Sequence, residues 1–223
     1  MKDITLPKIF EPFHCSNIVR LGKDYDGGYL VNYEDVLKST KLISLGIGND
    51  VSFEEDFVKI NDCRVDAYDG TIDHCAEFFS SPNKNLYIAN IGHSSGNKRL
   101  SEILTEEDRN VFLKCDIDGA EYEILDELIE HSHKFSGIAI EFHQVYEYTL
   151  FNLLSNFIAK TNLKLIHTHL NNNSYIEIPN GYIPDCVELS FTSSNNISLS
   201  SISLPHKLDM PNMSSRDDFR ILF

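Results

Sequence analysis

Short apolar segments alternate with segments of helical spacing along most of this chain, and this alternation restricts the fold more than any other feature. Runs such as "KLISLGIG" (41–48) and "SGIAIEFH" (136–143) have the length and composition of buried strands. Strands separated by helices form βαβ units, so we expect an α/β fold with a mostly parallel sheet and helices on both faces. The predicted strands are 41–48, 63–69, 85–92, 110–116, 136–143, 163–170 and 186–192, and the predicted helices are 52–60, about 120–132 and 148–160.

The length of the chain, 223 residues, is that of one ordinary domain with a substantial core. Residues 1–30 precede the first predicted strand and are expected to form an N-terminal extension. Residues 193–223 are rich in Ser, Asn and Pro, which favours an irregular C-terminal tail. The sequence contains no repeat and no interdomain linker, so we expect a single domain over residues 1–223.

Charge and composition exclude several classes of function. The formal net charge is −15 at pH 7, which argues against a nucleic acid partner, because binding a polyanion requires a basic surface. No apolar run approaches the ~18 residues that span a bilayer, and residues 1–10 lack the apolar core of a signal peptide. The cysteines are odd in number and form no CxxC pair, which predicts reduced thiols in a cytoplasmic protein; they are Cys15, Cys63, Cys75, Cys115 and Cys186. Cys115 lies in an apolar run and is interpreted as a packing residue.

A glycine pair after the first predicted strand indicates a cofactor site. In "SLGIGND" (44–50), Gly46 and Gly48 let the backbone approach a ligand, and Asp69, at the end of the next strand, has the spacing of a ribose-binding acid. Asp69 could instead simply cap the turn formed with Thr71. A dinucleotide site prefers a third glycine, but Asp50 occupies that position and further acids follow, which would repel a pyrophosphate. The pattern therefore favours S-adenosylmethionine over a nicotinamide cofactor.

Four polar groups follow the fourth and fifth predicted strands: Asp116, Asp118, Glu141 and His143. Because side chains alternate along a strand, the two aspartates share a face, and so do Glu141 and His143. These groups converge if the two strands are neighbours. Glu121 and Glu123 fall in the first turn of the next helix, where acids offset the helix dipole.

Two other segments are candidates for ligand contacts. A looser polar set in "HTHLNNN" (167–173) includes His169 and Asn171. The segment "KDYDGGYL" (23–30) contains two adjacent glycines. It either folds over the cofactor or forms a plain hairpin turn, and the sequence does not separate these alternatives.

Together these segments resemble the FkbM-like group of class I, S-adenosylmethionine-dependent methyltransferases. The resemblance is carried by "DGGYL" (26–30), "SLGIGNDVSFEEDF" (44–57), "YDGT" (68–71), "LKCDIDGAEYEIL" (113–125), "IEFH" (140–143), "HTHLNNN" (167–173) and "LPHKLDMPN" (204–212). It implies a Rossmann-like fold with a seven-stranded sheet whose last strand is antiparallel. It also implies a cofactor over Gly46 and Gly48, with its ribose on Asp69, its adenine near Asn90 and Ile91, and its methionine end near Asp116.

This sequence departs from the common methyltransferase pattern at two positions. Ser44 stands where many of these enzymes have an acid before the glycines, and Asp50 replaces the usual third glycine. We expect the loop that contains Asp26 and Gly28 to supply the missing cofactor contacts.

The resemblance implies an O-methyltransferase that acts on a sugar hydroxyl, on a nucleotide-activated or glycan-bound sugar of a capsule or surface polysaccharide. We expect His143 to be the general base, because an unperturbed imidazole suits neutral pH. Asp116 or Glu141 would orient it, and Asp118, His169 and Asn171 would border the acceptor.

Other functions remain open from the sequence. One is a small-molecule O-methyltransferase assisted by Mg²⁺ or Mn²⁺ bound to Asp116, Glu141 and His143. Others are a non-catalytic cofactor-binding module and, disfavoured by Asp50, a nicotinamide-dependent dehydrogenase. A homo-oligomer is also compatible with the sequence.

Overall fold

The computed structural model describes residues 2–72, 77–179, 181–200 and 202–223. The prediction for Cys75 falls outside these residues. The other four cysteines are free thiols, and Cys115 is fully buried, which confirms its interpretation as a packing residue.

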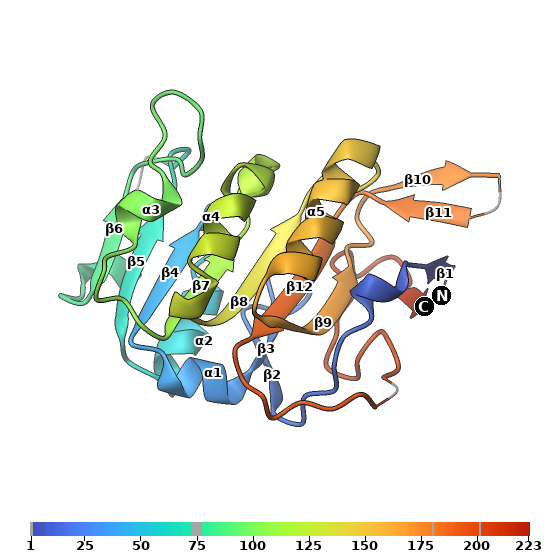
Figure 1. Cartoon of the computed structure of the whole chain (residues 1–223), viewed down its shortest axis with the longest axis horizontal. Helices are drawn as coiled ribbons and strands as arrows, with labels where there is room; N and C mark the ends of the chain where they lie inside the picture. Colours follow the sequence, from blue (N-terminus) through green and yellow to red (C-terminus); the bar gives the residue numbers. More distant parts are fainter. Residues whose placement is uncertain (1, 73–76, 180, 201) are drawn as a thin grey trace.

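A central sheet organises the described part of the chain, with seven strands in the order β6-β5-β4-β7-β8-β12-β9 (Figure 1). The β12 strand is antiparallel to both β8 and β9, whereas the remaining neighbours are parallel. This confirms the expected mostly parallel sheet with an antiparallel last strand. The strands are β4 (Lys41–Leu45), β5 (Arg64–Tyr68), β6 (Lys84–Tyr87), β7 (Val111–Cys115), β8 (Phe135–Phe142), β9 (Lys164–Leu170) and β12 (Val187–Thr192).

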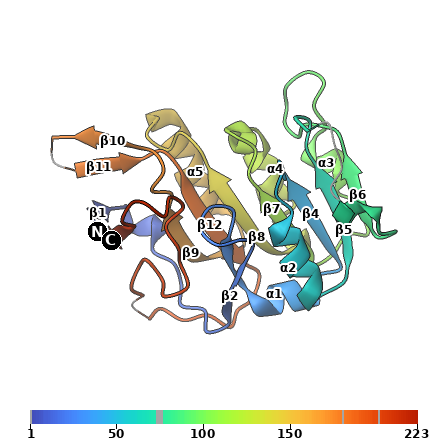
Figure 2. The ribbon, with the colours of Figure 1, turned by 180° about the vertical axis from the view of Figure 1, so that it is seen from behind.

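Helices cover both faces of the sheet, as expected (Figures 1 and 2). One face carries α1 (Tyr33–Lys38) and α2 (Ser52–Ile60), and the other carries α3 (Leu100–Ile103), α4 (Leu125–Glu130) and α5 (Tyr148–Lys160). The bounds predicted for α2 and α5 are confirmed. The predicted helix near 120–132 is divided into a 3-10 turn, η3 (Ala120–Ile124), and α4. Other short 3-10 turns are η1 (Lys8–Phe10), η2 (Glu77–Ser80) and η4 (Ser132–Lys134).

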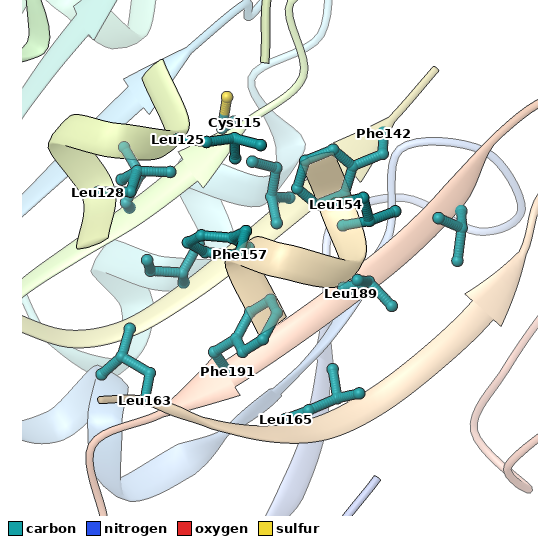
Figure 3. Close-up of a cluster of buried hydrophobic side chains, with 14 of the residues drawn as sticks. Cys115, Leu125, Leu128, Phe142, Leu154, Phe157, Leu163, Leu165, Leu189 and Phe191 are labelled. Carbon is teal, nitrogen blue, oxygen red and sulfur yellow. The ribbon is translucent and has the colours of Figure 1, made fainter. Parts of the chain in front are cut away.

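Apolar side chains fill the space between the sheet and the helices. Under α4 and α5, aromatic residues from helix and strand meet, with the ring centroids of Phe157 and Phe191 5.3 Å apart (Figure 3). On the opposite face, Phe57 of α2 packs on Phe112 of β7 at 5.1 Å. Packing in these two apolar cores fixes the positions of the strands whose carboxyl ends carry the polar residues.

The predicted N-terminal extension and C-terminal tail contain more regular structure than expected. The extension forms a hairpin of β2 (Ile18–Leu21) and β3 (Tyr29–Asn32), and β3 packs against β8, β12 and β9. The tail is largely irregular but ends in β13 (Phe219–Leu222), which pairs in parallel with β1 (Lys2–Thr5). A second hairpin, β10 (Tyr175–Ile178) and β11 (Gly181–Pro184), projects from the body (Figure 1). Across the described ranges, no helix combines the length and the apolar character needed to cross a membrane.

Candidate active site

The turn after β4 brings two strand ends into close contact. Gly46 has a φ of +71°, and a Cβ atom there would lie 1.7 Å from the carbonyl oxygen of Asp116. The Asp116 N–H donates to the carbonyl of Leu45 at 3.0 Å, which ties the ends of β4 and β7 together. Glycine is required at position 46 because neither the backbone conformation nor the space admits a side chain.

Asp69, at the end of β5, is held in one orientation by hydrogen bonds. The backbone N–H of Gly48 donates to Oδ2 at 2.8 Å, and the N–H and hydroxyl of Thr71 donate to Oδ1 at 2.8 and 2.7 Å. Burial favours the neutral acid, but the hydrogen bonds from Thr71 and Gly48 outweigh it and lower the pKa of Asp69. Asp69 therefore does cap the turn, and it does so while presenting a charged carboxylate to the glycine loop.

Two adjoining cavities, each of 240 Å³, open at this edge of the sheet. Asn90 and Ile91 line the first one, while Asp26, Gly48 and Lys114 line the second. Residues on the shared wall are Gly46, Asp69, Thr71, Asp116 and Asp118. The structure thus brings together seven of the residues predicted to bind the cofactor, namely Gly46, Gly48, Asp69, Asn90, Ile91, Asp116 and Asp26.

Gly28 is the exception. A Cβ atom there would lie 2.2 Å from the guanidinium of Arg20, whereas Gly27, with a φ of +84°, lines the second cavity. Arg20 donates to the carbonyl oxygens of Gly28 at 2.8 Å and Tyr25 at 2.6 Å. Gly28 therefore makes room for Arg20 rather than for a ligand.

The loop over residues 23–30 has the predicted hairpin form, and its place over a cofactor stays a prediction. The loop connects the antiparallel strands β2 and β3, so it is a hairpin. It also borders the second cavity, where Lys23 Nζ lies 3.0 Å from Oδ2 of Asp50. Arg20 and this ion pair hold the loop beside the glycine turn.

His143 follows β8 and faces the same edge. Its Nδ1 lies 2.9 Å from Oε1 of Glu121, and its Nε2 lies 3.8 Å from Oδ1 of both Asp116 and Asp118. The predicted convergence of His143 with the two aspartates is thus present. The residue that orients the ring, however, is Glu121, because only Glu121 lies within hydrogen-bond distance among these carboxylates.

The environment of His143 also changes its protonation. Burial favours the neutral imidazole, but hydrogen bonds to Cys186 and Glu121 and the charge of Glu121 raise the pKa of His143 to about 11. The expected imidazole of ordinary pKa is therefore not present. In the ligand-free protein His143 is a cation paired with a buried carboxylate.

Sequence reasoning missed the role of Glu121 because it assigned this acid only to the helix dipole. Glu121 is fully buried and also accepts the backbone N–H of Ile117 at 3.1 Å. The available signal was position: Glu121 lies three, four and seven residues before Ile124, Leu125 and Leu128, on the apolar face. Glu123, by contrast, accepts the N–H of Ser94 at 3.1 Å and holds a surface loop.

Glu141 and Asp116 are joined by a tyrosine. The hydroxyl of Tyr29, from β3, lies 3.1 Å from Oδ2 of Asp116 and 3.4 Å from Oε2 of Glu141. Burial, Glu188 and Asp116 raise the pKa of Glu141 to about 8, and burial also raises the pKa of Asp116. Asn171 donates to Oε1 of Glu141 at 2.9 Å. Asn171 therefore supports Glu141 from inside the protein.

His169 is not where the sequence suggested. It is buried, with Nδ1 3.1 Å from Glu188 and Nε2 3.1 Å from Asp218 of the C-terminal tail. It does not line either of the two cavities in the described structure. Both ring nitrogens have protein partners, so His169 anchors the tail and has no nitrogen left for an acceptor.

Potential metal ligands lie in two groups that share His143. One group is Asp116, Asp118 and His143, and the other is Glu141, His143 and Cys186; in each, the ligating atoms lie within 4.8 Å of one another. The predicted combination of Asp116, Glu141 and His143 is not such a group among the described residues. The donors of the first group suit Mg²⁺ or Mn²⁺, whereas the thiol of the second suits softer ions.

Comparison with known proteins decides the family. The model of the methyltransferase FkbM domain matches residues 9–175, which is most of the chain. The chain belongs to the FkbM methyltransferase family. Membership implies S-adenosylmethionine as the methyl donor, and it removes the nicotinamide-dependent alternative.

The solved structures that align with this FkbM methyltransferase are distant from it. Human methyltransferase 10 domain containing protein is 10% identical, with coverage of 73% of this chain and 79% of that chain and a TM-score of 0.45. A precorrin-6y methyltransferase from Geobacter metallireducens is 13% identical, with coverage of 72% and 86% and a TM-score of 0.42. A comparison with curated proteins finds no match.

Proposed function

We propose that this FkbM methyltransferase transfers the methyl group of S-adenosylmethionine to a hydroxyl of a sugar, either nucleotide-activated or glycan-bound, in the synthesis of a capsule or surface polysaccharide. The observation that carries the proposal is the position of His143. Its Nε2 lies 3.8 Å from Oδ1 of both Asp116 and Asp118, while Glu121 holds Nδ1. The two aspartates belong to the wall shared by the two cavities, and His143 stands behind them without lining either cavity.

The cofactor supplies a methyl group on a sulfonium, which needs only an aligned nucleophile and a proton acceptor. Asn90 and Ile91 would enclose the adenine, Asp69 would accept the ribose hydroxyls, and Gly46 and Gly48 would admit the backbone approach. Asp116, on the wall between the cavities, would lie beside the sulfonium.

His143 is the proposed acceptor of the hydroxyl proton. Against the effect of burial, hydrogen bonds to Cys186 and Glu121 raise the pKa of His143 to about 11, which favours the protonated ring in the ligand-free protein. A sulfonium bound beside Asp116 would add positive charge near His143 and would therefore favour the neutral ring. Cofactor binding would thereby free Nε2 to accept a proton.

The polar character of the site favours a polyhydroxylated acceptor. The side chain of Asp118 is 96% exposed, and Gln144, next to His143, is also exposed. Carboxylate and amide groups can each bind sugar hydroxyls that flank the reacting oxygen. Asp118 is accordingly the proposed acceptor contact, with Gln144 beside it.

A screen of nucleotide sugars with labelled S-adenosylmethionine tests this function. Turnover of one sugar by the wild type, and its loss in His143→Ala, would support the proposal. A non-catalytic module would bind S-adenosylhomocysteine yet transfer no label to any acceptor. Transfer to amines but not to hydroxyls would contradict O-methylation.

A metal-assisted reaction on a small natural product is the second candidate, favoured by the grouping of Asp116, Asp118 and His143. A divalent ion there would lower the pKa of a bound hydroxyl. Inactivation by EDTA and recovery with Mg²⁺ or Mn²⁺ would favour this candidate. Full activity in EDTA would favour the His143 base alone.

A further inference from the structure

A buried carboxylate in the second cavity has an oxygen without a protein partner. Glu54, in the first turn of α2, is 1% exposed and lines this cavity. The hydroxyl of Ser44 donates to its Oε1, whereas its Oε2 is buried and has no hydrogen-bond partner within the described structure. Leaving a buried acceptor unpaired costs about 1–3 kcal/mol, so a missing ligand is the natural explanation.

A buried lysine lines the same cavity. Lys114, on β7, is 7% exposed and donates to the carbonyl oxygen of Gly46. An ammonium group has three donors, so Lys114 retains donors beyond this bond. Its positive charge also acts on Glu54, where it opposes the effect of burial.

These two charges do not neutralise each other directly. Because Oε2 of Glu54 has no partner, it is not bonded to Lys114. The cavity therefore presents one buried negative group and one buried positive group, both with unused hydrogen-bonding capacity. This is the complement of an α-amino acid, which carries an ammonium and a carboxylate on one carbon.

We propose that Glu54 binds the ammonium group, and Lys114 the carboxylate, of the methionine portion of S-adenosylmethionine. The assignment rests on the cofactor of the family and is independent of the acceptor. It also explains Ser44: the acid that many methyltransferases carry before the glycines is supplied here from α2, through the hydrogen bond between Glu54 and Ser44.

Two ligands separate this role from a structural one. S-adenosylhomocysteine carries the amino acid portion, whereas 5′-methylthioadenosine keeps the adenosine and thioether but lacks it. Calorimetry on the full chain should show that Glu54→Gln, which preserves shape, weakens S-adenosylhomocysteine about 10–100-fold, the loss of one charged hydrogen bond. Its affinity for 5′-methylthioadenosine should stay within about 2-fold of the wild type.

The matched control is Glu55→Gln, the same change at the next, exposed position of α2; it should alter neither affinity. Lys114→Met should reproduce the selective loss of S-adenosylhomocysteine. If this variant does not fold, Lys114→Gln, which can still donate to the Gly46 carbonyl, replaces it.

The outcomes are distinct. Unchanged S-adenosylhomocysteine affinity in Glu54→Gln would overturn the assignment of Glu54 to the ammonium group. Unchanged affinity in the Lys114 variants would overturn the assignment of Lys114 to the carboxylate. Equal weakening of both ligands would mean that these residues only support the fold of the site. Because no acceptor is present, these results are independent of whether a sugar is methylated.

Discussion

His143 is the residue on which the proposed chemistry depends most. If its Nε2 accepts the hydroxyl proton, His143→Ala should lower kcat by roughly 10²–10⁴-fold, the range for loss of a positioned base. S-adenosylhomocysteine affinity should hardly change, because His143 is not among the residues that line either cavity. Steady-state kinetics, calorimetry and melting temperature check this prediction. A wild-type kcat would remove His143 from the mechanism, and a lower melting temperature with normal turnover would give it a structural role.

A second prediction for a single residue concerns Asp69. Its carboxylate is fixed by Gly48 and Thr71, so its remaining lone pairs can accept from a ribose without reorganisation. Asp69→Ala should weaken S-adenosylhomocysteine by about 1–3 kcal/mol. Thr71→Val, which removes one hydroxyl donor to Asp69 and keeps the charge, is the control and should have a smaller effect. Loss of stability with unchanged affinity in Asp69→Ala would mean that this acid only caps the turn.

The β4–α2 turn allows a matched test at the level of the element. Gly46 and Gly48 both have positive φ, +71° and +51°, so alanine is strained at each. Only at position 46 would the added Cβ also collide, 1.7 Å from the Asp116 carbonyl oxygen; at position 48 it meets nothing within 4 Å. We expect Gly48→Ala to cost about 1 kcal/mol of folding free energy, and Gly46→Ala about 3 kcal/mol or more. Urea denaturation measures both values, and equal costs would show that β4 and β7 separate easily.

The elements outside the sheet position the site from its open side. β3 delivers Tyr29 to Asp116 and Glu141, and the loop before it brings Asp26 and Gly27 to the second cavity. The tail reaches the same loop, since Asn212 donates to Oδ1 of Asp26 at 3.1 Å and to Oε1 of Glu188 at 2.6 Å. The extension and the tail are therefore both in contact with the loop that borders the second cavity.

The buried acids beneath the site affect the stability of the whole molecule. The groups that face Glu141 are Glu188, Asp116, His143, Tyr29 and Asn171. Burial, Glu188 and Asp116 raise the pKa of Glu141 to about 8 from its ordinary 4.5. A carboxyl with a raised folded-state pKa contributes stability that is fully present below 4.5 and is lost as pH rises through about 8.

Glu141→Gln should remove this pH dependence. Glutamine can still accept from Asn171 and interact with the Tyr29 hydroxyl, while it carries no charge at any pH. The stability of this variant relative to the wild type should increase by about 3 kcal/mol between pH 5 and pH 8, because each pH unit between the two pKa values contributes about 1.4 kcal/mol. Urea unfolding at both pH values measures the change, with the exposed Glu130→Gln as control. If the free energies of unfolding of the variant and the wild type differ by the same amount at both pH values, the assigned pKa shift of Glu141 is contradicted.

Sequence alone determined the features that depend on neighbouring residues. Apolar spacing is a local property, so α2 and α5 were predicted to their ends. Parallel strand ends meet at one edge, so Asp116, Asp118 and His143 were expected to converge there, as they do. The alternation of strand-like and helical segments likewise predicted the α/β fold class.

Only the tertiary structure decided which side chains face one another. Glu121 satisfies a helix-start pattern, yet packing turns it to His143; His169 ends a strand, yet the distant Asp218 and Glu188 enclose it. The β1–β13 pair, and the contact of Glu54 with the Ser44 hydroxyl inside a cavity, likewise depend on the folded arrangement. Such contacts join residues that no periodic pattern relates, because their free energy comes from burial and charge in the assembled interior, which local spacing does not encode.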